Sequence, residues 1–457
     1  MIDQSRRAFL KRAAALGIVG GAGPFVMNLA AIGEAAAATA SDYKALVCIF
    51  LFGGNDYANT VIPYDQASYN LYATQRGSIA LARDTLTATG LNPAAPLAGG
   101  RQYALHPNLA PLIPLYDANR LAVILNVGSL VQPTSKTNYT NRSVPLPPKL
   151  FSHNDQQSYW QASNPEGATS GWGGRIGDLL QSGNGSAALT CISASGNSVY
   201  LSGRSAIQYA VTTTGPIPLL NNATTLFGSA AGMSALRGLA TSPRTNLFEN
   251  EHATVTKRSL DLQAQVTASL AAAPTLTTPF PANNSLADQL RIVARLISVS
   301  QELGAKRQVF FVSLGGFDNH DSILTTHPVL MTRVGAAMRY FHDATVELGV
   351  ADRVTSFTGS DFGRTLTSNA NGSDHGWGSM HMVMGGAVNG RAFYGTPPVI
   401  ANNGPDDVGQ GRLLPSLSVD QYAATMASWF GVANGSMSTV LPNINNYNPS
   451  SWNQGFV

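Results

Sequence analysis

The chain has 457 residues, of which only 12% are charged, about half the share found in an average soluble protein. Hydrophobic residues nevertheless make up 44% of the chain, which excludes an intrinsically disordered protein. The formal net charge of +3 is too small for a nucleic-acid-binding surface, so we expect a large, weakly charged globular protein with no nucleic-acid partner.

The N-terminus has the features of an export signal. Arg6 and Arg7 precede Phe9 and Leu10, and a weakly apolar stretch with small residues suited to cleavage follows. Glycines and a proline make this stretch a poor membrane-spanning helix. We therefore predict a twin-arginine signal peptide over residues 1–40, with the twin-arginine translocase as a partner during export. The mature protein is expected to be periplasmic or secreted, without a stable membrane anchor.

Six apolar runs predict the strands of a central sheet. Most end at Gly, Asn, Asp or Ser, and they lack the alternation of a half-exposed strand, which is typical of parallel strands buried on both faces. They lie at residues 45–52, 121–127, 187–193, 308–314, 354–358 and 380–385. Two amphipathic helices are predicted, from Ser285 to near Gly304 and from about Pro328 to Leu348. The alternation of strands and helices indicates a doubly wound α/β fold.

Residues 41–457 are predicted to form a single domain. Residues 195–284 are poor in charge and rich in Ser, Thr, Asn and Ala, and we expect them to be an insertion or cap on the main sheet. Residues 129–150 are expected to form a long surface loop.

Cys48 and Cys191 are the only cysteines. One disulfide between them is compatible with an oxidising compartment. Both residues lie in predicted buried strands, however, and this favours two buried free thiols.

Acidic residues and histidines gather where the predicted strands end. Ligands of doubly wound sheets bind beyond the carboxyl ends of the strands. Asp and Gly are also ordinary turn residues, but a chain with 25 acidic residues rarely places an Asp after three separate strands. Mixed carboxylate and imidazole ligands suit Zn, Mn or Fe, and carboxylate-rich sites suit Mg, Ca or Mn. The candidate metal ligands are Asp56, Asp318, His320, Asp361, His375 and His381.

Several motifs together resemble a bacterial family, domain of unknown function 1501. Besides the export signal, they are Phe52-Gly53-Gly54-Asn55-Asp56, Ser152-His153, Gly359-Ser360-Asp361-Phe362-Gly363-Arg364-Thr365 and Asp374-His375. The resemblance covers essentially the whole mature chain. That family is similar to the alkaline phosphatase and sulfatase superfamily, whose members hydrolyse phosphate or sulfate esters at one or two metals. The resemblance implies an alkaline-phosphatase-like three-layer α/β/α sandwich with a mostly parallel sheet.

The resemblance also implies roles for the metal ligands. Asp56 and Asp361 match metal-binding positions of the superfamily, as does the pair formed by Asp318 and His320. The sequence departs from the superfamily at Phe362, where a metal-binding histidine is expected. His375 and His381 are the candidates to replace this histidine.

The groups that would act on the ester are less clear. No nucleophile motif of the superfamily is present, and we take Ser152 as the candidate nucleophile, with Thr60 as the second choice. Arg364 is the candidate for holding the ester oxygens, although a surface salt bridge is an equal alternative.

These features predict an exported hydrolase of phosphate or sulfate esters that uses one or two ions of Zn, Mn, Mg or Ca. Its substrate is expected to be a small-molecule or polysaccharide ester. The alternative is a secreted protein that keeps the fold without the chemistry and binds carbohydrate or another envelope component. Phe362 and the missing nucleophile motif favour this alternative, whereas the retained Asp318 and Asp361 favour the enzyme.

Overall fold

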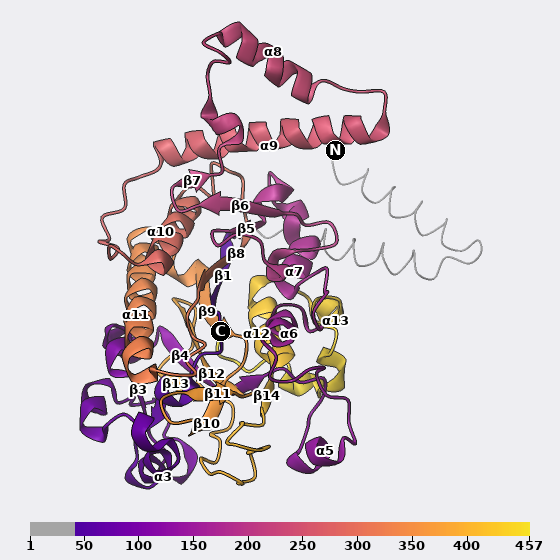
Figure 1. Ribbon diagram of the computed structural model, residues 1–457. Coiled ribbons are helices and arrows are strands. Elements are labelled where there is room, and N and C mark those ends of the chain that lie inside the picture. The colour runs from indigo at the N-terminus through magenta and orange to yellow at the C-terminus, as the bar shows by residue number, and fades with distance from the viewer. Residues whose placement is uncertain (1–41) are drawn as a thin grey trace, which may run out of the picture.

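A ten-stranded sheet forms the centre of the computed structural model, which describes residues 42–457 (Figure 1). The predicted signal peptide over residues 1–40 lies outside the described residues. The strands of the sheet are β1 (Lys44–Leu51), β4 (Leu121–Gly128), β5 (Cys191–Ser193), β6 (Gln208–Thr212), β7 (Gly215–Pro216), β8 (Arg307–Leu314), β9 (Val354–Ser360), β12 (Ser379–Gly385), β13 (Ala392–Tyr394) and β14 (Leu417–Ser418). Their order is β13-β4-β12-β9-β1-β8-β5-β6-β7, with β14 also paired to β4.

The middle of the sheet is parallel. Strand β1 pairs with β8 on one side and with β9 on the other, and Leu51 lies opposite both Leu314 and Ser360. The carboxyl ends of these three strands therefore meet at one edge of the sheet. Strand β12 runs antiparallel to both β4 and β9, so the prediction of a parallel direction is wrong for this strand. An apolar run reports burial on both faces, not direction.

Helices cover both faces of the sheet, which confirms the predicted α/β class. On one face lie α10 (Ser285–Ser298) and α11 (Ile323–Glu347), and on the other lie α7 (Trp172–Leu180) and α12 (Val419–Phe430) (Figure 1). Alternate side chains of β1 enter the two cores: Val47 and Ile49 belong to the first, and Leu46 and Phe50 to the second. Double-sided burial explains why β1 reads as an unbroken apolar run.

The two predicted helices are confirmed, with shifted ends. The N-cap of α10 is Asn284, whose side chain accepts a hydrogen bond from the backbone of Ala287. Helix α11 begins at Ile323, so Pro328 lies inside it. Pro328 is the sixth residue of the helix, beyond the first turn, so it removes one backbone hydrogen bond of α11 and does not mark its first residue.

The remaining helices and strands surround this framework. The helices are α3 (Gln66–Arg76), α4 (Ile113–Asp117), α5 (Lys136–Asn141), α6 (His153–Ala162), α8 (Ala230–Thr241), α9 (Leu247–Ala272) and α13 (Met437–Val440). Two small antiparallel pairs are formed by β2 (Val61–Pro63) with β3 (Tyr103–Leu105) and by β10 (Arg364–Ser368) with β11 (Ser373–His375). Cys48 and Cys191 are buried free thiols, as predicted.

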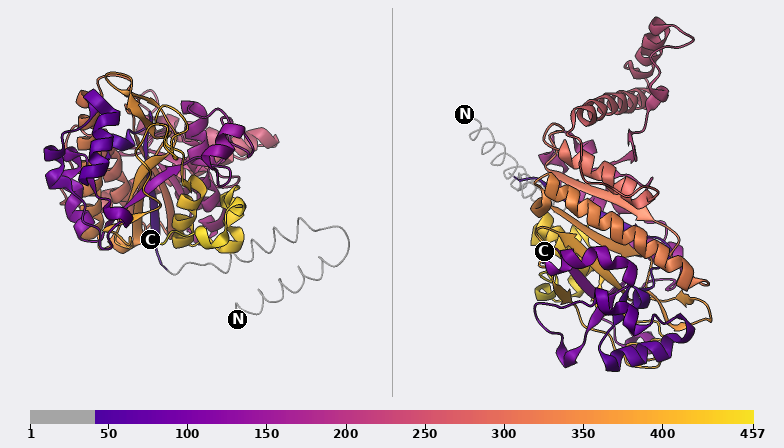
Figure 2. Two further views of the ribbon diagram at one scale, coloured as in Figure 1. Left: turned by 90° about the horizontal axis from the view of Figure 1, so that it is seen from below. Right: turned by 90° about the vertical axis from the view of Figure 1, so that its left-hand side faces the viewer.

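Residues 195–284 divide between the sheet and an arm. Strands β6 and β7 extend the edge of the sheet, whereas α8 and α9 project from the body of the molecule (Figure 2). Helix α9 buries few of its residues, and Phe227 and Phe248 of this region are exposed. None of the helices within residues 42–457 is both long and apolar enough to cross a membrane.

We predict that Gly53, in the turn after β1, tolerates no side chain. Its φ of +115° disfavours other residues, and a Cβ atom would lie 2.4 Å from the backbone nitrogen of Asp318. Gly53→Ala should therefore lower the free energy of unfolding by at least about 2 kcal/mol. Gly99→Ala is the control, because Gly99 also has a positive φ, of +70°, but open space around it, and should cost only about 1 kcal/mol. Equal urea midpoints for the two variants would contradict the steric argument.

Candidate functional site

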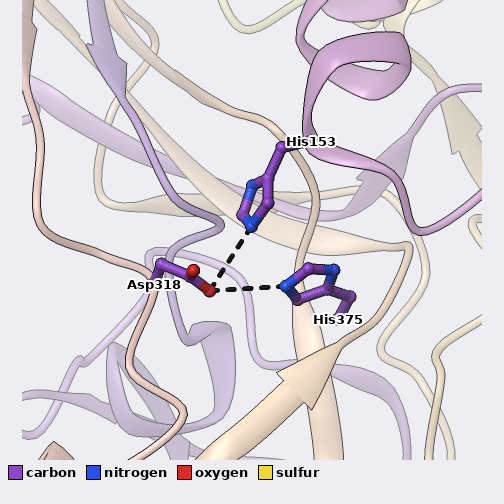
Figure 3. A group of neighbouring side chains, drawn as sticks. All are labelled: His153, Asp318 and His375. Carbon is purple, nitrogen blue, oxygen red and sulfur yellow. Dashed lines mark ion pairs between the residues drawn. The ribbon is translucent and has the colours of Figure 1, made fainter.

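Three side chains converge beyond the carboxyl ends of the central strands. Asp318 follows β8, His153 is the first residue of α6, and His375 is the last residue of β11 (Figure 3). Each of the three offers a ligand atom, and these atoms all lie within 4.8 Å of one another. The parallel strands supply the acid, and two segments distant in sequence supply the imidazoles.

The spacing of these atoms suits a metal ion. The Nε2 atoms of His153 and His375 each lie 3.4 Å from Oδ1 of Asp318. Around a tetrahedral ion with bonds of about 2.0–2.1 Å, neighbouring ligand atoms are about 3.3–3.4 Å apart. The group therefore has the donor types and two of the three spacings of a three-ligand zinc-type centre.

Asp361, at the end of β9, orients His153. Its Oδ2 atom accepts hydrogen bonds from Nδ1 of His153 at 2.7 Å, from Nε2 of Gln157 at 2.8 Å and from the backbone of Gly53 at 3.1 Å. The hydrogen bond that His153 donates to Asp361 raises the pKa of His153 against the opposing effect of burial. With Nδ1 fixed, Nε2 faces Asp318, and this buried atom has no hydrogen-bond partner within the described part of the chain. A carboxylate behind a histidine ligand is the usual outer partner in metal sites.

His375 is oriented by the backbone. Its Nδ1 atom donates to the carbonyl oxygen of Phe151 at 2.7 Å, which directs Nε2 towards Asp318. Burial is the main cause that lowers the pKa of His375. The neutral imidazole favoured in this way is the form that binds metals.

His320 occupies the open side of the group. Its Nε2 atom lies 3.1 Å from Oδ1 of Asp318 and 2.9 Å from Nε2 of His375. Its Nδ1 atom lies 3.0 Å from Oδ1 of Asp374. The side chain of His320 is 45% exposed, more than those of His153 and His375. His320 is therefore the most accessible to solvent of the three histidines.

Arg364 is fully buried beneath the group. It donates to the carbonyl oxygens of Ser373 and Gly53 and, at 3.0 Å, to Oδ1 of Asp318. Burial acts to raise the pKa of Asp318, but the hydrogen bond and charge of Arg364 outweigh it and the pKa is lowered. The structure thus places Arg364 as a support of Asp318, with its donors directed at the protein.

Two of the predicted metal ligands lie apart from the group. Asp56 forms a buried ion pair with Arg76 at 2.7 Å and accepts a hydrogen bond from Ser373. Burial acts to raise the pKa of Asp56, but Arg76 and its other partners lower it overall. His381 is buried between the rings of Trp160 and Tyr422. Asp56 is thus engaged by Arg76 and Ser373, and His381 contacts Thr358 through Nδ1, whereas its buried Nε2 atom has no hydrogen-bond partner in the described chain.

The predicted nucleophiles also have other partners. The hydroxyl of Ser152 donates to Oδ2 of Asp155 at 3.0 Å, within the first turn of α6. The hydroxyl of Thr60 is buried and donates to the backbone of Asp56 at 2.7 Å. Within residues 42–457, neither hydroxyl forms a hydrogen bond with Asp318 or with the histidines around it.

Phe362 fills the position at which the superfamily resemblance implies a histidine. Its ring lies beside those of His153 and His375, with centroid distances of 4.9 Å and 4.8 Å. Gly54 makes room for it, since a Cβ atom there would lie 2.3 Å from the Phe362 ring. The aromatic ring thus forms an apolar wall of the group.

The candidate set derived from the sequence omits His153 and Gln157. Both contact Oδ2 of Asp361, and their spacing of four residues places them on one face of α6. The Ser152-His153 motif points to this helix, but from the sequence alone we take Ser152 as the candidate nucleophile and not His153 as a ligand.

His381 provides a test of the packing beneath the site. Burial lowers the pKa of His381 to about 3. The unfolded chain, with a histidine pKa of about 6.5, binds the proton more readily, so wild-type stability falls as the pH drops from about 6.5 to 3. His381→Phe should weaken this loss, by up to about 1.4 kcal/mol per pH unit, when unfolding by urea is compared between pH 6.5 and 4.5. His252→Phe on the exposed surface of α9 is the control, and equal pH dependence in the two variants would contradict the assignment.

Comparisons with known proteins identify the family to which the chain belongs. The model of a family described as "Protein of unknown function (DUF1501)" matches residues 43–432. A search of curated proteins finds no match.

Solved structures show distant likeness to the chain. The crystal structure of Ps i-CgsB in complex with k-i-k-neocarrahexaose is 11% identical, with a TM-score of 0.36, over 90% of this chain and 78% of that one. The PsFucS1 sulfatase from Pseudoalteromonas sp. is 10% identical, with a TM-score of 0.32, over 94% of this chain and 72% of that one. Similarity at this level does not indicate the activity of this chain. The family match covers most of the chain, which therefore belongs to the family of proteins of unknown function DUF1501.

Proposed function

We propose that the protein is a periplasmic or secreted, metal-dependent hydrolase of phosphate or sulfate esters. The observation that carries this proposal is the convergence of His153, Asp318 and His375, with two donor spacings of 3.4 Å, at the carboxyl edge of the sheet. Three protein ligands with one open position are typical of catalytic zinc sites.

The residues fit a divalent cation such as Zn²⁺ or Mn²⁺. Nε2 of His153 is buried without a hydrogen-bond partner in the described chain, and Asp361 and Phe151 hold the two imidazoles from behind. A bound cation would act as a Lewis acid that polarises the ester oxygens. The chain itself would supply the ligands, their orientation and the transfer of protons.

His320 is the proposed proton carrier. Its Nδ1 atom is held by Asp374, and Nε2 lies on the open side next to Asp318. We propose that Nε2 accepts the proton of the attacking water as oxygen bonds to phosphorus or sulfur. The bond to the leaving oxygen then breaks, and His320 returns the proton to that oxygen. Direct attack by water accounts for the absence of a serine or threonine contact at Asp318 among the described residues.

A binding protein without catalysis is the second candidate. Phe362 occupies the place of an expected histidine, and Asp56 is committed to Arg76. Two positions that would supply ligands for the second metal of the superfamily are therefore not available for metal binding. A single ion that only anchors an anionic ligand would be compatible with such a site.

We predict that the wild-type protein, dialysed against Zn²⁺ or Mn²⁺, retains about one ion per chain. His153→Ala and His375→Ala should lose it, because each removes one of three ligands. Asp361→Asn keeps the ligands but loses the charge behind His153, and should weaken the affinity about 10- to 100-fold. Elemental analysis and competition with a chelator measure these changes, with His252→Ala as the control. Wild-type metal content in both alanine variants would refute the ligand set.

We predict that the metal-loaded protein hydrolyses at least one of p-nitrophenyl phosphate, bis-p-nitrophenyl phosphate and p-nitrophenyl sulfate. His320→Gln should lower kcat about 100-fold or more while the metal content stays unchanged, because a proton carrier is lost and the ligands remain. Asp318→Asn should abolish both metal binding and turnover. Full kcat in His320→Gln would reject the proton carrier, and a metal-loaded wild type that turns over none of the esters would favour the binding protein.

A further inference from the structure

A cavity of about 710 Å³ lies next to the candidate site. It is lined by Tyr139, Thr140, Arg142, Leu146, Pro147, Pro148, Lys149, Leu150 and Phe151, and we call it the 139–151 cavity. Phe151 belongs to the site as well, because its carbonyl oxygen accepts the hydrogen bond from Nδ1 of His375. His153 follows two residues later. The cavity and the proposed metal group therefore share a wall.

The charge of the cavity is positive. Among the described residues, Arg142 and Lys149 are the only charged residues that line it, and no acidic side chain of residues 42–457 does so. Within residues 42–457, the guanidinium of Arg142 forms no ion pair and no hydrogen bond. Lys149 lies 3.8 Å from the buried carboxylate of Asp155, but its own side chain is 70% exposed. In a chain with so few charges, an acid-free cavity with two cations favours an anionic ligand.

The other lining residues offer apolar and aromatic surface. The rings of Tyr139 and Phe151 lie 5.6 Å and 6.4 Å from that of Trp377, and Arg412 stacks on Phe151 at 4.7 Å. Arg412 also donates to the carbonyl oxygen of His375, so this stack is fixed to the site. Aromatic walls with a few placed polar groups are typical of sites for ring-shaped ligands.

Three residues of this segment have a backbone conformation in the left-handed region. Arg142, Lys149 and Phe151 have φ angles of +50°, +46° and +74°, in the left-handed region that non-glycine residues rarely adopt. They are the two cations of the cavity and the residue that orients His375, and Arg142 has this conformation as the C-cap of α5.

We propose that the 139–151 cavity binds a second anionic group of the substrate, while the ester to be cleaved lies at His153, Asp318 and His375. The substrate class is then an oligosaccharide that carries several sulfate or phosphate groups. Arg142 and Lys149 pair with the second anion, and the aromatic wall contacts the sugar ring that bears it. This inference rests on the proposed function, although binding in the cavity does not itself require turnover.

The test compares dextran sulfate with unsubstituted dextran. Binding to the full-length protein is followed by calorimetry at about 0.15 M salt, where long-range attraction is screened. The wild type should bind dextran sulfate and not dextran. The double variant Arg142→Gln/Lys149→Gln should bind dextran sulfate at least about ten-fold more weakly, with an unchanged melting temperature.

A matched control removes two cations elsewhere. Arg204 and Arg333 are exposed and lie outside the cavity, so Arg204→Gln/Arg333→Gln changes the net charge equally. Equal weakening in both double variants would show attraction to overall charge and overturn the proposal, as would unaltered binding in the cavity variant or no binding by the wild type.

Two further measurements separate this inference from the proposed function. Metal content and turnover of p-nitrophenyl esters should be unchanged in the cavity variant, because these small esters do not reach the second anion site. Loss of metal in the cavity variant would overturn the proposal of a separate subsite. A wild type that holds no metal, yet binds dextran sulfate through Arg142 and Lys149, would reject the hydrolase and retain the anion site.

Discussion

The buried carboxylate of Asp361 joins the parts of the protein on which the site depends. It stands at the end of β9 and accepts hydrogen bonds from the turn after β1 and from two side chains of α6. An ionised carboxylate held in the interior is costly unless its partners are fixed, so the same contacts fix the turn and the helix. His153 faces Asp318 because of this arrangement. The geometry of the group therefore follows from the three hydrogen bonds that a single oxygen atom, Oδ2 of Asp361, accepts.

Contacts of this kind show what several of the few charged residues do in the structure. Asp56 and Arg76 form an ion pair inside the protein, and the buried Arg364 pairs with the partly exposed Asp318. Arg364 alone links β10 to the turns after β1 and β8. Surface ion pairs contribute little to stability, whereas breaking a buried pair is costly. Some of the few charges in this chain therefore serve internal connections.

The framework of the fold follows from the sequence because its signals are local. Strands β1 and β8 contain unbroken apolar runs because both of their faces are buried, and β9 is an equally buried strand of small and apolar residues; the carboxyl ends of β8 and β9 locate Asp318 and Asp361. The direction of β12 and the docking of α6 depend on contacts between distant segments, which no local pattern records. For the same reason Asp56 and His381 resemble ligands in sequence, although Arg76 and Trp160 engage them in the fold.

The two unpaired cysteines have a consequence for where this chain can acquire its native structure. Cys48 and Cys191 are buried in separate strands, and burial raises the pKa of both thiols. Thiolates are therefore scarce and shielded from oxidants, and no covalent cross-link is needed to complete the core. The native fold is consequently indifferent to the redox potential around it. An oxidising compartment is therefore not needed to complete the native core.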